Sequence, residues 1–175
     1  MTATESPTTD GLPILPHQAS EFYVWLWWAS EQQEGVFDLG EKVGRFDLWV
    51  DERLAFRNPH DVKVTAVMTG EEPARTLEAR AALAGGKVLQ ELRLHLRRDD
   101  REFTFTLKGP AMEVAQAKLP QAVGGEEALY DRMFLYEELT FVVAALLRTF
   151  GVARTAPSWG SETLPTIQRW VAGRD

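Results

Sequence analysis

The 175-residue chain contains no cysteine. This absence excludes a disulfide scaffold, a cysteine nucleophile and a thiolate metal site, and it fits a reducing compartment such as the cytoplasm. Long apolar runs are also missing. The longest, Leu139 to Leu147, spans about nine residues, whereas a membrane-spanning helix needs roughly 20. We therefore expect a cytoplasmic protein without a membrane partner.

The chain also lacks an excess of basic residues. The net charge is −7, from 26 acidic and 19 basic side chains. Ten of the acidic residues lie in the first 52 residues, where the only bases are Lys42 and Arg45, and the rest of the chain is close to neutral. Nucleic-acid affinity comes largely from cations that neutralise phosphates, so any DNA-binding face must be local.

Aromatic residues are concentrated near the start, in "EFYVWLWWASEQ" (residues 21–32). The segment can be read as a strand or as a helix, and a helix is favoured because Ser20 is a good N-cap and Gly35 a good stop. Its aromatics could belong to a core, stack on bases or dock onto another subunit. If they dock, the expected interface residues are Tyr23, Trp27 and, in the C-terminal tail, Trp170.

The remaining segments predict an α+β domain in which an antiparallel sheet of about five strands packs against the N-terminal aromatic helix and C-terminal helices. Strands are expected at 45–50, 54–58, 61–70 and in a hairpin at 87–109. Helices are expected at 69–86, at 110–120, from about 126 to Gly151, and in the tail. The expected divisions are a disordered leader (1–19), a domain (20–152), and a linker with a short helix (153–175).

The hairpin carries the clearest two-sided pattern. Leucines at 92, 94 and 96 alternate with Arg93, His95 and Arg97, which predicts one apolar and one cationic face. Cations on such a face could contact a phosphate backbone, although acids in the same hairpin make a solvated, salt-bridged face the main alternative. The candidate DNA-binding residues are Lys63, Lys87, Arg93, His95, Arg97, Arg98, Arg101 and Lys108.

Catalytic signatures are weak. The three histidines lack the spacing of a metal pair, and neither Gly85-Gly86 nor Gly124-Gly125 belongs to a phosphate-binding motif. Glu91 and Arg93 have the acid-x-base spacing found at the end of metal-dependent nuclease sites, without a convincing lysine. We expect no catalytic residue, no metal site and no cofactor.

Four stretches carry a family resemblance: "EFYVWLWWASEQQEGVFDL", "EARAALAGGKVLQELRLHL", "REFTFTLKG" and "YDRMFLYEELTFVVAALLRTFG". In this order they resemble the C-terminal part of the recombination-associated RdgC family over roughly residues 20–151, as in a short RdgC-like protein. The resemblance implies a nucleoid-associated, ring-forming dimer that binds duplex DNA during recombination.

Three functional hypotheses follow. The first is an RdgC-like protein that binds DNA through its backbone, without sequence preference and without catalysis. The second is a protein-interaction or oligomerisation module, either a homodimer or a subunit of a larger complex. The third is a metal-dependent nuclease.

Overall fold

The computed structural model describes residues 16–61, 65–70, 77–121, 125 and 127–173. Its helices are α1 (Pro16–Gln32), α2 (Leu77–Ala84), α3 (Ala128–Thr155) and α4 (Leu164–Val171), with a short π-helix, η2 (Trp159–Thr163), between the last two. Its strands are β1 (Val36–Asp38), β2 (Arg45–Arg57), β3 (Thr65–Thr69), β4 (Val88–Arg98), β5 (Arg101–Lys108) and β6 (Glu113–Lys118).

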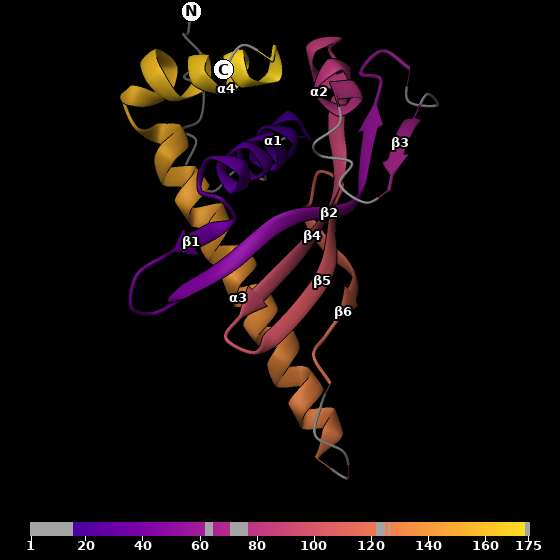
Figure 1. Cartoon of the computed structure of the whole chain (residues 1–175), viewed down its shortest axis with the longest axis vertical. Helices are drawn as coiled ribbons and strands as arrows, with labels where there is room; N and C mark the ends of the chain where they lie inside the picture. Colours follow the sequence, from indigo (N-terminus) through magenta and orange to yellow (C-terminus); the bar gives the residue numbers. More distant parts are fainter. Residues whose placement is uncertain (1–15, 62–64, 71–76, 122–124, 126, 174–175) are drawn as a thin grey trace, which may run out of the picture.

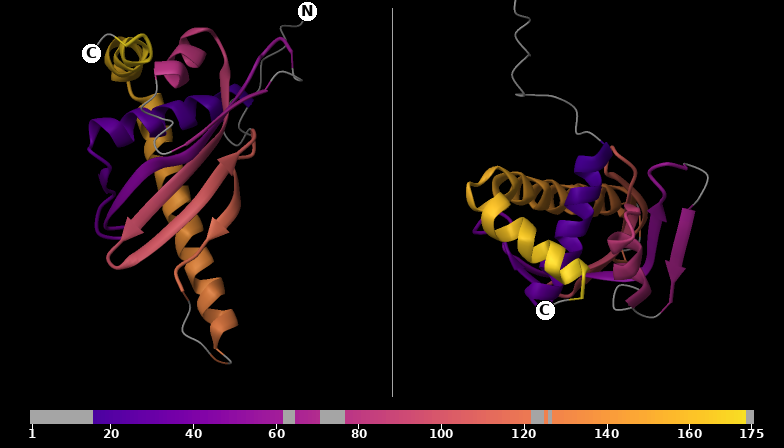
Figure 2. Two further views of the ribbon diagram at one scale, coloured as in Figure 1. Left: turned by 45° about the vertical axis from the view of Figure 1, so that its right-hand side comes forward. Right: turned by 90° about the horizontal axis from the view of Figure 1, so that it is seen from above.

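The strands form one antiparallel sheet in the order β1-β2-β4-β5-β6, and β3 pairs with the second half of β2. Helices α1 and α3 lie on the same side of this curved sheet, with α4 above α1 and α2 at one end (Figures 1 and 2). The α+β class and the packing of the aromatic and C-terminal helices against the sheet are confirmed. Over the described residues the sheet has six strands, where about five were expected.

The β4–β5 hairpin has the predicted register. Leu92, Leu94 and Leu96 face Leu107, Phe105 and Phe103, and all six are buried. Alternation places these side chains on the face that α1 and α3 cover, where burial of each apolar side chain contributes roughly 1.5–3 kcal/mol. The opposite face of the hairpin carries Arg93, His95 and Arg97, whereas Arg98 and Arg101 lie on the leucine side, where both pair with Glu138 of α3.

Helix α1 supplies much of the core beneath the other helices. Phe22 and Leu26 are fully buried, and Phe22 and Trp25 contact Phe150 of α3 with ring centroids 6 Å apart or less. The Tyr23 hydroxyl donates a hydrogen bond of 2.8 Å to the carbonyl oxygen of Gly109. Burial, with a smaller contribution from the Glu91 carboxylate, raises the pKa of Tyr23 well above its usual value. These contacts join α1 to the far end of the hairpin.

Several expected boundaries are wrong. Residues 113–118 form strand β6, not a helix, because Val114 and Ala115 pair with Leu107 and Thr106 at the edge of the sheet. Residues 45–57 form one strand with an irregularity near Glu52, whose φ is +34°. Helix α1 begins at Pro16, inside the expected leader. Helix α3 continues through Gly151 to Thr155, since Gly151 keeps a helical conformation.

Candidate functional site

The arginines of the predicted cationic face make ion pairs with carboxylates from other elements. Arg97 donates through Nε to Oδ2 of Asp47 on β2, at 3.0 Å. Arg98 and Arg101, at the hairpin turn, both bind Glu138 of α3, whose side chain is only 10% exposed. A carboxylate that is already close enough to pair with a guanidinium competes with any phosphate for it. Three of the predicted DNA contacts are therefore compensated within the chain.

The other predicted contacts are also engaged or partly covered. Arg93 is only 8% exposed, and its Nη1 lies 3.4 Å from Oγ1 of Thr106. His95 stacks on Trp49 with ring centroids 4.4 Å apart, and its Nε2 lies 3.7 Å from Glu102.

Lys87 and Lys108 are half-buried, and Lys63 lies outside the described residues. The described candidates thus share one hairpin without forming an exposed cationic surface.

The aromatic residues predicted to form an interface are buried, so that prediction is wrong. Tyr23, Trp27 and Trp170 are at most 2% exposed, so none of them is available to a partner. Trp27 and Trp170 meet edge to face, with ring centroids 4.9 Å apart, and both indole N–H groups find an acceptor within the chain. Packing buries the large apolar rings, and the internal acceptor Glu31 satisfies both indole N–H groups, so their burial leaves no polar group unpaired.

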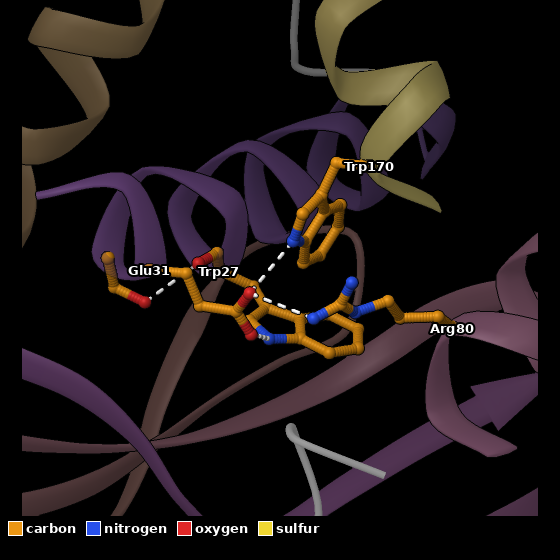
Figure 3. Close-up of polar contacts among 5 residues, drawn as sticks. Trp27, Glu31, Arg80 and Trp170 are labelled. Carbon is orange, nitrogen blue, oxygen red and sulfur yellow. Dashed lines mark hydrogen bonds and ion pairs between the residues drawn. The ribbon is translucent and has the colours of Figure 1, made fainter. Parts of the chain in front are cut away.

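Glu31 binds three donors from three helices (Figure 3). Its Oε1 accepts from Nε1 of Trp27 at 2.9 Å, and its Oε2 accepts from Nε1 of Trp170 at 2.8 Å. Nη2 of Arg80, on α2, lies 3.3 Å from the same Oε2, and its guanidinium stacks over the Trp170 ring. The Glu31 cluster, defined as Trp27, Glu31, Arg80 and Trp170, therefore joins α1, α2 and α4.

A cleft of about 1060 Å³ lies beside this cluster, between α1 and β2. Its lining includes Glu34, Asp47, Asp51, Glu52 and the exposed edge of Trp49. Among the described residues, no three His, Asp or Glu side chains are grouped so as to hold a metal ion. The described lining of the cleft therefore gives the metal-dependent nuclease hypothesis no support.

Of the eleven large apolar side chains that are exposed among the described residues, seven lie on α3. Its inner side is buried against the core through Leu135, Leu139, Val142 and Leu146. The opposite side, which we call the outer face, also carries large apolar side chains, and all of them are exposed: Leu129, Tyr130, Met133, Phe134, Tyr136 and Phe141. A helix that is apolar all round is normally buried on all sides. Here one side is covered and the other is not.

The position of the outer face is fixed by the rest of the fold. The first turns of α3 project beyond the end of the sheet (Figures 1 and 2). Further along, Glu138 holds the flank of the helix to the hairpin turn through Arg98 and Arg101. Beside this clamp, Phe134 and Phe141 line an open groove together with Arg98 and Arg101, and both phenyl rings remain exposed to solvent.

The sequence contained a signal for the outer face that the prediction did not use. The stripe expected to be buried, from Leu135 to Phe150, is the inner side, but Met133, which was expected to widen that stripe, is 54% exposed. Tyr130, Phe134 and Phe141 follow the same helical spacing on the opposite side, and an aromatic stripe opposite a complete core stripe predicts a second contact surface.

Comparison with protein families, with curated proteins and with solved structures gave no match. No single helix among the described residues is long and apolar enough to cross a membrane, and α3 reaches that composition only together with residues 159–171, across a 90° bend.

Proposed function

We propose that this chain is a non-catalytic protein-interaction module whose docking surface is the outer face of α3. The observation that supports the proposal is the exposure of large side chains there, with Tyr130 71% and Phe134 63% exposed. With roughly 200 Å² for each large side chain, the exposed parts of the outer face amount to an area of about 700 Å². That area exceeds the roughly 300–600 Å² of the largest patch on a typical monomer and approaches the roughly 800 Å² that a stable partner covers.

The charge pattern favours a protein partner over a membrane surface or a nucleic acid. Helices that lie on membranes usually carry many lysines or arginines along their polar face, which anionic lipids attract. The net charge here is −7, and the described cations of the hairpin are mostly paired or covered. The outer face itself is apolar and aromatic, which is the composition of interface centres.

Photo-cross-linking in cells tests this proposal. We expect that a photo-reactive phenylalanine analogue replacing Phe134 forms a discrete covalent adduct with a protein, because that side chain lies at the centre of the outer face. The same analogue in place of Trp49, which is 36% exposed on the uncovered side of the sheet, is the matched control and should give little adduct. Equal labelling at both positions, or none at Phe134, would contradict the proposal.

RdgC-like DNA binding stays a prediction of the sequence. It gains little support from the geometry, because Asp47 and Glu138 already occupy Arg97, Arg98 and Arg101. A DNA-binding assay titrated with salt tests it, since phosphate contacts make affinity fall steeply with salt.

A further inference from the structure

We propose that the occupant of the outer face is a second copy of this chain. The α3 helices of the two copies pack antiparallel. A two-fold axis relates them and crosses each helix between Val142 and Val143. This inference rests on the proposed function and specifies the partner. It comes from the order of the exposed side chains along α3. When a second α3 runs in the opposite direction, each of these side chains faces one of complementary size or charge.

The exposed side of α3 has a heptad pattern. A row of exposed residues runs along α3 in alternating steps of four and three positions, and we call this row the seam. Its members are Tyr130, Phe134, Glu137, Phe141, Ala144, Arg148, Gly151 and Thr155. An alternation of four and three, an average of 3.5, is the spacing with which two helices pack side by side in a coiled coil. The inner residues of α3, such as Leu139 and Leu146, lie on the other side and remain in the core.

Antiparallel pairing matches large seam residues with small ones. With the axis at the stated point, Phe134 faces Gly151 of the second copy, and Phe141 faces Ala144 of the second copy. Each contact occurs twice because of the two-fold symmetry. A side chain added at Gly151 would meet nothing within 4 Å in the single chain, so space for a partner's phenyl ring is present there. A parallel arrangement would instead set Phe134 against Phe134 and Gly151 against Gly151, leaving a gap.

The same alignment matches the two charges of the seam. Glu137 faces Arg148 of the second copy, and Arg148 faces Glu137 of the second copy. Within one chain these residues are eleven positions apart, about 16 Å along the helix, and neither makes an ion pair with any residue that the structure describes. Two acidic proteins repel each other in general, but in this arrangement the two charges of each seam cancel. At each end of the paired helices, Tyr130 of one copy lies beside Thr155 of the other.

The flanks of the seam add apolar area. Leu129, Met133 and Tyr136 lie along one edge, and Val152, which is 73% exposed, lies along the other. Leu129, Met133 and Tyr136 are already part of the outer face, and Val152 extends it, so each copy offers an area close to the roughly 800 Å² per partner of a standard interface.

Charge reversal tests the pairing. Purified protein should have twice the 19.7 kDa chain mass by light scattering at tens of micromolar concentration. Glu137→Arg and Arg148→Glu should each weaken the dimer at least about ten-fold, because each places like charges together in two layers. The double variant Glu137→Arg/Arg148→Glu should restore the dimer. Arg132→Glu, on the same helix and roughly 160° around its axis from Arg148, should have no effect.

A steric variant keeps the test independent of charge. Gly151→Leu has open space in the single chain and improves helix propensity, so it should fold, yet it should abolish dimerisation because the added side chain meets Phe134 of the second copy. A monomeric wild-type protein, or a double charge variant as weak as the single ones, would overturn the inference. If purified protein is monomeric but Phe134 cross-links to a different chain in cells, the proposed function stands and this inference fails. If both results are negative, both fail.

Discussion

Replacing Glu31 with alanine is expected to lower the free energy of unfolding by about 2–4 kcal/mol, because it leaves the buried indole N–H groups of Trp27 and Trp170 without an acceptor. Arg80 loses its partner as well, but that ion pair is partly exposed and contributes less. Urea denaturation measures the loss. Hydrogen exchange should show α4 released first, since Trp170 is its main buried anchor.

Two variants sharpen this result. Glu31→Gln keeps one carbonyl oxygen, which can serve Trp170, while its amide group faces the Trp27 N–H, so we expect about half of the alanine effect. Glu41→Ala, which removes an exposed carboxylate from a turn, is the control and should change stability by less than about 0.5 kcal/mol. If Glu31→Ala behaves like Glu41→Ala, the Glu31 cluster does not hold the helices together.

The second large effect is a difference between the two sides of α3. Leu139→Ala should cost about 2–5 kcal/mol, because Leu139 is fully buried and its truncation leaves a cavity. Phe134→Ala removes a larger side chain but should cost less than about 0.5 kcal/mol, because Phe134 is exposed in the single chain. Both are compared by denaturation in the Arg148→Glu background, where self-association does not add to stability.

Equal losses for the two variants would mean that the outer face is covered by the chain's own residues. A large loss for Leu139→Ala alone would establish that the aromatic residues of the outer face do not maintain the fold. Contact with a partner would then explain their presence.

Local patterns were enough to predict much of this fold. The alternation of leucine with polar residues predicted the β4–β5 hairpin and its buried side, and helical spacing predicted the inner side of α3. Strand β6 was missed because its short segment between prolines reads as a helix, and only pairing with β5 makes it a strand. Propensity over six residues is weaker than such tertiary pairing.

The candidate site was harder to predict, because its charges are set by distant residues. The partners of Arg97, Arg98 and Arg101 are Asp47 and Glu138, which are 37 to 50 positions away along the chain. Trp27 and Trp170, 143 positions apart, are buried together, and Glu31 accepts a hydrogen bond from each indole. Sequence spacing shows which side chains share a face, but not which distant carboxylate lies opposite.

Disulfide formation between two single-cysteine variants tests the central claim, a second copy packed antiparallel on the outer face of α3, most directly. The natural chain has no cysteine, so every cross-link comes from the introduced residues. A mixture of Glu137→Cys protein and Arg148→Cys protein should form a covalent dimer on mild oxidation, because the two positions share a layer. Each variant alone should not form one. In its dimer the cysteines of the two copies would be about 16 Å apart, and a disulfide requires Cα atoms within roughly 7 Å. Cross-linking of Glu137→Cys with itself, or no cross-linking in the mixture, would contradict the account.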